Sequence, residues 1–202
     1  MRTPHDLASR LIERKVDVCF AHADHDRDAR IELADVSLLF VRILVYLGEP
    51  LGSRKAQAVL AASQGFCDHI AAVTGWRPDR AITPEEWREA MTKALIGGAA
   101  DYDAYFKPVG EAVWSAVDRD DDGQIRLTEF TAFQQGMGTP APNIALAAAR
   151  MGLPTGTSEV PLGDILRAHR EFYTSDDPEA AGNWLYGDVW ADEFWDGTKA
   201  GL

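Results

Sequence analysis

The chain has 202 residues, and its 20 Lys and Arg against 32 Asp and Glu give a formal net charge of −12 at pH 7. Hydrophobic residues make up 46% of it and charged residues 26%, which is the composition of a folded globular protein. The negative charge repels the phosphates of nucleic acids and anionic lipids, so we expect neither a nucleic acid nor a membrane as a partner.

Helical periodicity recurs along the whole chain. Apolar residues at three- and four-residue steps predict a first helix that ends near residue 23 and a second over residues 36–47, which Gly48-Glu49-Pro50 ends. Further helices are predicted over residues 53–73, from Pro84 onward, and over 102–117, 128–135, 142–151 and 162–173. Sustained period-two alternation is absent, so any strands must be very short. The chain therefore reads as helix, polar loop, helix, four times over.

The third polar loop, residues 118–129, has the sequence DRDDDGQIRLTE and matches the twelve-residue calcium loop of an EF-hand. Calcium prefers oxygen ligands. Aspartates stand at loop positions one, three and five, a backbone carbonyl is available at position seven, and a glutamate at position twelve closes the shell with two oxygens. Gly123 allows a positive-φ turn around the ion, and Ile125 faces a partner loop. The predicted ligands are Asp118, Asp120, Asp122, Gln124 and Glu129. The alternative is an acidic turn between helices.

The first polar loop, residues 24–35, has the sequence DHDRDARIELAD and keeps the three aspartates and the inward isoleucine. Ala29 replaces the turn glycine, which costs about 1 kcal/mol in a left-handed conformation. Asp35 replaces the closing glutamate and is expected to offer one oxygen, leaving a smaller shell that suits Mg²⁺ better than Ca²⁺. The predicted ligands are Asp24, Asp26, Asp28, Arg30 through its carbonyl, and Asp35. The alternative is an empty acidic loop.

The second and fourth loops, residues 75–86 and 153–164, repeat this design without its ligands. Arg77 puts a cation at position three of the second loop, and Leu153, Thr155 and Thr157 take the first three ligand positions of the fourth. Neither loop is expected to bind a metal. Because EF-hands fold as pairs whose position-eight residues form a short antiparallel bridge, we expect two pairings, Ile31 with Ile82 and Ile125 with Val160.

The predicted fold is all-α, with four EF-hand units in two pairs packed into one compact body and very short two-stranded bridges between paired loops. The first pair is expected to span residues 1–98, with an active loop at 24–35 and a degenerate one at 75–86. The second is expected to span residues 99–202, with an active loop at 118–129, a degenerate one at 153–164, and an aromatic C-terminal tail over residues 174–202.

The chain resembles sarcoplasmic calcium-binding proteins, and more closely the bacterial calerythrin-like members of that family. The four EF-hand units carry this resemblance together with residues 172–187, FYTSDDPEAAGNWLYG, which are similar to the family's C-terminal segment. The resemblance implies a cytosolic calcium buffer or signal modulator without catalysis, monomeric, in which the two halves pack on each other. This chain departs from the family at Ala29, at Asp35 and in its ligand-free fourth loop.

Two other binding functions are open at this point. A calcium sensor that grips a protein target presents a methionine-rich groove, whereas this chain has only four Met residues. The tail instead concentrates aromatic residues that either plug the cleft between the halves or line a site for a hydrophobic small molecule, as in luciferin-binding and photoprotein relatives. These aromatic residues are Trp184, Tyr186, Trp190, Phe194 and Trp195.

An enzymatic function is not expected. His22, His25 and their neighbouring aspartates could suggest zinc, but the aspartate spacing already assigns them to a calcium loop, with His25 pointing outward. His69 and His169 are expected to be core or surface histidines, because no nucleophile motif accompanies them.

The expected location is cytoplasmic. The first 20 residues lack the unbroken apolar segment of a signal peptide, and the apolar stretch over residues 36–47 is too short to span a bilayer. The two cysteines, Cys19 and Cys67, are too few for a disulfide scaffold and are expected to be reduced core thiols.

Overall fold

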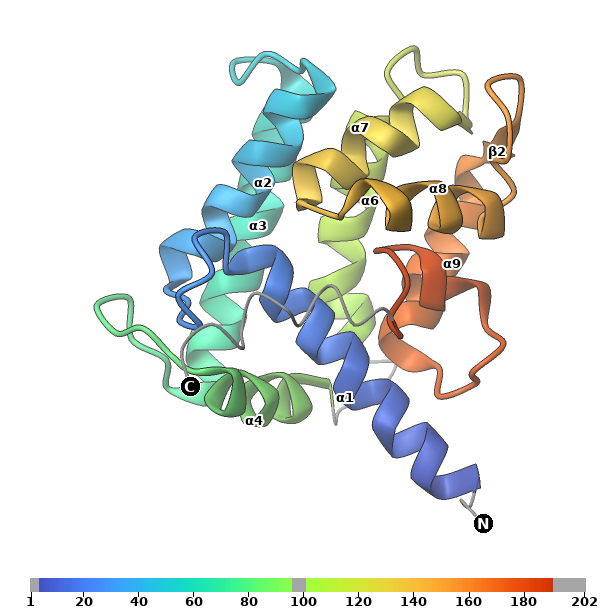
Figure 1. Ribbon diagram of the computed structural model, residues 1–202. Coiled ribbons are helices and arrows are strands. Elements are labelled where there is room, and N and C mark those ends of the chain that lie inside the picture. The colour runs from blue at the N-terminus through green and yellow to red at the C-terminus, as the bar shows by residue number, and fades with distance from the viewer. Residues whose placement is uncertain (1–3, 96–100, 191–202) are drawn as a thin grey trace.

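The computed structural model describes residues 4–95 and 101–190, and helices dominate it (Figure 1). The first half contains α1 (Pro4–Ala23), α2 (Leu33–Leu47), α3 (Arg54–Thr74) and α4 (Pro84–Leu95). The second contains α6 (Lys107–Val117), α7 (Leu127–Met137), α8 (Ala141–Arg150) and α9 (Leu162–Thr174). A π-helical turn, Tyr102–Phe106, leads into α6, and a 3₁₀ turn, Ala181–Trp184, follows α9. The all-α fold and its expected helices are confirmed.

The four loops are joined in pairs through short backbone bridges. In the second half, β1 (Gln124–Arg126) runs antiparallel to β2 (Glu159–Pro161), with Ile125 opposite Val160. In the first half, Ile31 and Ile82 exchange two backbone hydrogen bonds with N···O distances of 3.1 and 2.9 Å. Both expected position-eight pairings are therefore confirmed. The expected boundary between the pairs, residues 98 and 99, lies outside the described residues.

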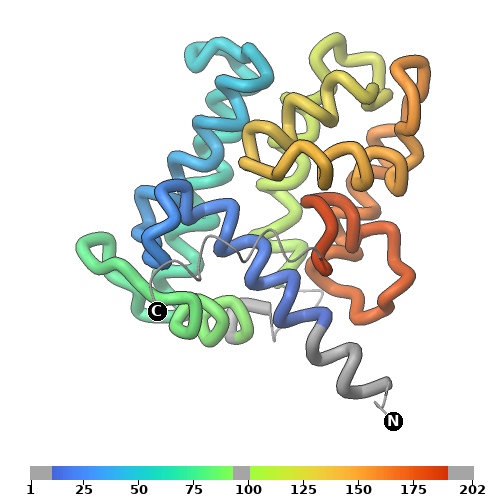
Figure 2. The backbone as a smooth tube through the Cα atoms, viewed as in Figure 1, coloured from blue at the N-terminus to red at the C-terminus, as the bar shows by residue number. Residues whose placement is uncertain are grey.

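The two halves lie side by side and meet where α2 crosses α7 (Figures 1 and 2). Gly136 of α7 approaches the backbone of Ile43 of α2 so closely that a Cβ at Gly136 would stand 2.6 Å from the Ile43 Cα. Only a residue without a side chain fits this separation. The position of α7 against α2 thus depends on a single glycine.

Arg42 of α2 joins three chain segments at the same crossing. Its Nε donates to the carbonyl of Gly136 at 3.0 Å, and its Nη2 donates to the carbonyls of Met137 and His22 at 3.1 and 3.0 Å. These carbonyls lie in the last turns of α7 and α1, where helical carbonyls lack intrahelical partners. A cation there satisfies them and complements the negative end of each helix dipole.

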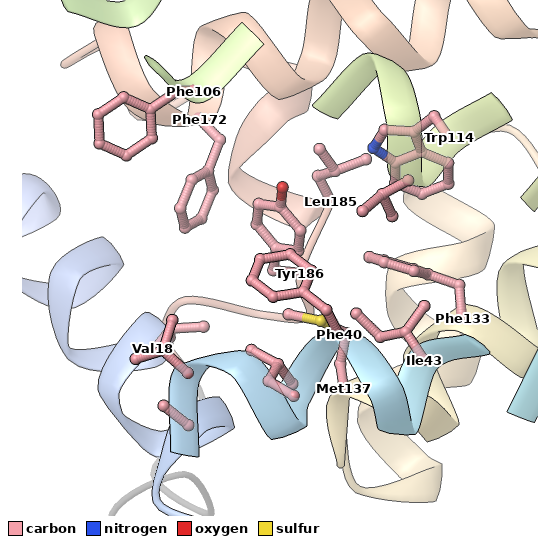
Figure 3. Close-up of a cluster of buried hydrophobic side chains, with 14 of the residues drawn as sticks. Val18, Phe40, Ile43, Phe106, Trp114, Phe133, Met137, Phe172, Leu185 and Tyr186 are labelled. Carbon is pink, nitrogen blue, oxygen red and sulfur yellow. The ribbon is translucent and has the colours of Figure 1, made fainter. Parts of the chain in front are cut away.

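The C-terminal segment enters the core through Tyr186, which lies among Phe172, Phe133 and Phe40 in Figure 3. Its ring centroid is 4.7 Å from that of Phe172 and 6.0 Å from that of Phe133. Leu185 and Val189 are buried beside it. The tail therefore packs between helices of both halves, and a cavity of about 80 Å³ remains.

The two tryptophans in the described part of the tail contribute less to this plug than the sequence suggested. Trp184 is half-buried, with the Arg150 guanidinium 4.8 Å from its ring centroid, and Trp190 is exposed. Phe194 and Trp195 lie outside the described residues. A tyrosine, rather than a tryptophan, is the aromatic side chain that the described part of the tail places in the core.

Two histidines lie in the core, where desolvation by burial lowers the pKa of His22 and of His169 to about 3. Tyr102 Oη lies 2.9 Å from His169 Nδ1. His69 stacks on Tyr105, with ring centroids 3.3 Å apart. These contacts fit packing roles for His69 and His169.

Both cysteines are free, Cys67 being buried and Cys19 half-buried. This agrees with the expected reduced thiols. Within the described ranges, none of the helices has the length and apolar character needed to cross a membrane.

The α2–α7 crossing leads to a prediction with an internal control. Gly136→Ala should lower the free energy of unfolding by about 1–3 kcal/mol, because the added methyl group pushes two helices apart. Gly65→Ala, in α3 where an added Cβ meets no atom within 4 Å, should raise it by about 0.5–1 kcal/mol. Urea unfolding of both variants in chelator measures the difference, and equal effects would refute the close crossing.

Candidate metal centres

The loop 118–129 brings three carboxylates together between α6 and α7. One carboxylate oxygen from each of Asp118, Asp120 and Asp122 lies within 4.8 Å of the others. Asp118 is buried, and its two oxygens accept hydrogen bonds from the backbone N–H groups of Asp122 at 3.2 Å and Gly123 at 3.0 Å. Gly123 has φ +77°, as the turn requires. Such a set of hard oxygen donors fits a divalent cation of the calcium or magnesium class.

Glu129 ties the two ends of this loop together. Its Oε2 accepts from the backbone N–H of Arg126 at 2.9 Å, which caps α7, and its Oε1 accepts from the N–H of Arg119 at 3.1 Å. The side chain is buried although it is ionisable. Because its carboxylate reaches from position twelve back to position two, Glu129 is placed to close the loop over a bound ion.

Arg126, at position nine, is a functional residue that the sequence reasoning missed. Its Nη1 lies 3.1 Å from Asp120 Oδ2, and its Nη2 pairs with Asp122. A hydrogen bond from the backbone N–H of Gln124, together with one from Arg126, holds the pKa of Asp122 below its usual value. Asp122 and Arg126 both lie outside the helices, so no helical spacing rule signalled their contact.

The loop 24–35 has the same backbone conformation despite its altered sequence. Asp24 is buried, and its oxygens accept from the N–H groups of Asp28 and Ala29, both at 3.1 Å. Carboxylate oxygens of Asp24, Asp26 and Asp28 lie within 4.8 Å of one another. Ala29 has φ +60°, so the expected left-handed alanine is observed. Burial, aided by the neighbouring carboxylates of Asp28 and Asp26, raises the pKa of Asp24.

Both loops also share a left-handed residue at position four, which was not predicted from the sequence. Arg27 has φ +61° and Asp121 has φ +57°. Each loop thus carries two left-handed residues, at positions four and six, and their backbones turn in the same way. The position-seven residues correspond too, since the N–H groups of Arg30 and Gln124 each donate at 2.8 Å to the aspartate two residues earlier.

The residues at position twelve, Asp35 and Glu129, differ in how far their carboxylates reach across the loop. Asp35 Oδ2 accepts from the N–H of Glu32 at 2.8 Å and so caps α2, as Glu129 caps α7. At position two, however, the N–H of His25 donates to the carbonyl of Ala23 at 2.8 Å. The corresponding N–H in loop 118–129 donates to Glu129. Asp35 is one methylene shorter than a glutamate. Its carboxylate caps α2 but does not accept from the position-two N–H at the start of loop 24–35.

The two remaining loops fill their ligand positions with other interactions. In loop 75–86, Arg77 pairs with Asp79 at 2.9 Å, and Arg80 pairs with the closing Glu86. In loop 153–164, Thr155 Oγ1 lies 3.2 Å from Thr157 Oγ1 and 2.9 Å from Ser158 Oγ. A cation or a hydroxyl cluster thus takes the place of converging carboxylates in these loops.

The histidines near loop 24–35 do not join its carboxylates. His22 is buried in the core and borders the central cavity, while His25 is exposed. Among the described residues, the groups of side chains placed to share a metal ion are the two aspartate triplets. These triplets consist of oxygen donors alone, which calcium and magnesium prefer.

Comparison with known proteins agrees with this architecture. No family model matches the chain. Calerythrin from Saccharopolyspora erythraea is 28% identical over 156 residues, which cover 76% of this chain and 87% of calerythrin. The expectation of a calerythrin-like EF-hand protein is confirmed.

Solved structures show the same fold. The structure of a Streptomyces coelicolor calcium-binding protein superposes with a TM-score of 0.64 at 23% identity, covering 81% of this chain and 98% of that one. The coelenterazine-binding protein of Renilla muelleri superposes with a TM-score of 0.61 at 23% identity, covering 91% and 98%.

The left-handed Ala29 leads to a prediction that needs no metal. Ala29→Gly should raise the free energy of unfolding by about 1 kcal/mol in chelator, because glycine adopts this conformation without steric cost. Ala34→Gly, at an exposed position in the first turn of α2, should lower it by about 0.5–1 kcal/mol. Chemical denaturation of the two variants tests the sign, and a loss of stability in Ala29→Gly would contradict the strained turn.

Proposed function

We propose that this protein is a calcium-binding EF-hand protein that acts as a cytosolic calcium buffer or signal modulator, with its stronger site in loop 118–129. The observation that supports this most directly is the convergence of three aspartate side chains in a loop that Glu129 closes. The Streptomyces coelicolor protein to which the chain is similar is described as a calcium-binding protein.

Each ligand in loop 118–129 has a distinct task. The three aspartates supply carboxylate oxygens from one side, the backbone carbonyl of Gln124 supplies another, and Glu129 supplies two from the exiting helix. Calcium, when bound, provides the positive charge that relieves the mutual repulsion of these carboxylates. Because Arg126 already pairs with Asp120 and Asp122, that guanidinium must yield part of its contact as the ion enters.

Loop 24–35 is proposed as a weaker calcium site that holds Mg²⁺ in a resting cell. Asp35 does not make the contact with the position-two N–H that Glu129 makes in the other loop, and it is expected to offer the ion one oxygen instead of two. The resulting shell of six ligands is sufficient for Mg²⁺. Ala29 adds strain to the same turn. This loop would then serve a structural purpose, while loop 118–129 responds to calcium. Loops 75–86 and 153–164 are proposed to remain without metal.

The buffer role is favoured over a carrier of a hydrophobic small molecule. Pockets for such ligands are mostly apolar and typically measure about 300–1,000 Å³, whereas the apolar central cavity here measures about 80 Å³ and Tyr186 of the tail borders it. A larger pocket of about 430 Å³ beside α1 and α9 has a more polar lining that includes Lys15, Arg170 and Asp176. A protein target gripped by a methionine-rich groove is also disfavoured, because Met91 and Met137 are buried in the core. We also propose that the protein is monomeric and has no catalytic activity.

Removal of the closing glutamate tests the stronger site. Glu129→Gln should weaken calcium binding at loop 118–129 by about 100-fold or more, because the shell loses a charged bidentate ligand. Native mass spectrometry, with calcium and then with magnesium, counts the ions, and calorimetry gives the affinities. Glu111→Gln, an exposed carboxylate on α6, serves as the control and should bind like the wild type. A tight calcium transition retained by Glu129→Gln would assign the site elsewhere.

Lengthening the other closing residue tests the weaker site. Asp35→Glu should raise calcium affinity at loop 24–35 about fivefold, since the restored oxygen is worth about 1 kcal/mol. Magnesium competition at this loop should fall at the same time. Calcium titrations with and without millimolar magnesium, in a Glu129→Gln background, isolate the effect. An unchanged titration in both conditions would show that Asp35 does not limit this loop.

A further inference from the structure

Lys55, in the first turn of α3, reaches from the first half of the chain into the calcium loop of the second half. Its Nζ donates to the backbone carbonyl of Asp118 at 2.5 Å and lies 2.7 Å from Asp121 Oδ1. The Lys55 side chain is 20% exposed, whereas that of Asp121 is 72% exposed. The contact joins residues 63 positions apart in the sequence.

The contact falls at a residue with two roles. Asp118 is the C-terminal cap of α6, so its carbonyl lies at the negative end of that helix dipole. It is also the proposed position-one ligand of the loop, because one of its carboxylate oxygens lies within 4.8 Å of carboxylate oxygens of the other two aspartates. A half-buried ammonium group at this carbonyl stabilises the end of α6 and places a positive charge beside the metal loop, where solvent and salt screen it incompletely.

We propose that Lys55 opposes calcium at loop 118–129 electrostatically, and that calcium binding in turn weakens the contact between α3 and this loop. The inference rests on the proposed calcium site. A fixed positive charge repels an incoming divalent cation, and the calcium ion competes with Lys55 for the negative field of the loop. Such coupling is reciprocal. The factor by which Lys55 lowers the affinity of the loop for calcium therefore equals the factor by which bound calcium weakens the contact of Lys55.

This contact is particular to one of the two active loops. Position four, which gives Lys55 its carboxylate in loop 118–129, is Arg27 in loop 24–35. An arginine there has no carboxylate to offer to a lysine. Lys55 therefore lowers the calcium affinity of loop 118–129, which has the fuller ligand set, and leaves that of loop 24–35 unchanged. The difference in calcium affinity between the two loops becomes smaller.

Calcium titration of the full chain tests the proposal. An Asp24→Asn background disables loop 24–35, so that only loop 118–129 titrates. In that background Lys55→Met should raise calcium affinity about fivefold, or about 1 kcal/mol, with a shallower dependence on salt. Lys55→Arg, which keeps the charge, should bind like its parent. Arg54→Met removes the same charge from the adjacent exposed position and should change the affinity less than twofold, as expected for an exposed, screened charge.

A second measurement reads the contact without calcium. In chelator, Lys55→Met should unfold at a lower urea concentration than Arg54→Met, because it alone loses the tie between α3 and α6. Calcium affinities that are equal in Lys55→Met and Arg54→Met would overturn the inference and leave the proposed function intact. A parent protein that binds no calcium in loop 118–129 would instead overturn the proposed function.

Discussion

The structure depends on the close crossing of α2 and α7, where Gly136 meets the backbone of Ile43. Each of these helices begins at a candidate metal loop, because Asp35 lies in the first turn of α2 and Glu129 in the first turn of α7. The crossing therefore fixes both closing carboxylates relative to one rigid interface. Arg42 adds to it by satisfying carbonyls from the ends of α1 and α7.

Each half combines a loop that gathers three aspartate carboxylates with a loop whose ligand positions are filled by other side chains. The silent loop still contributes, since its position-eight residue provides the backbone partner for the active loop. Ion pairs and hydroxyl contacts take the place of converging carboxylates in the other two loops, as Arg80 with Glu86 and Thr155 with Ser158 illustrate. An EF-hand pair can thus keep its backbone bridge when only one of its loops carries the three aspartates.

Concentrated negative charge is balanced differently in the two active loops. In loop 118–129, two cationic side chains form ion pairs with the aspartates: Arg126 from within the loop and Lys55 from the other half of the chain. In loop 24–35, burial and neighbouring carboxylates raise the pKa of Asp24, which records the cost of its negative charge. Under the proposed function, ligand number and internal counter-charge act in opposite directions on the relative calcium affinities of the two loops.

The helices, the four loops and their pairing follow from the sequence, because helical periodicity and the positions of a twelve-residue loop are local properties. Even the left-handed Ala29 was predictable, since the loop imposes that conformation whatever residue occupies it. The contact of Lys55 and the burial of Tyr186 in place of Trp184 and Trp190 were not predictable. These contacts join residues far apart in the chain, and their existence depends on how α2 and α7 pack, which only the tertiary structure decides.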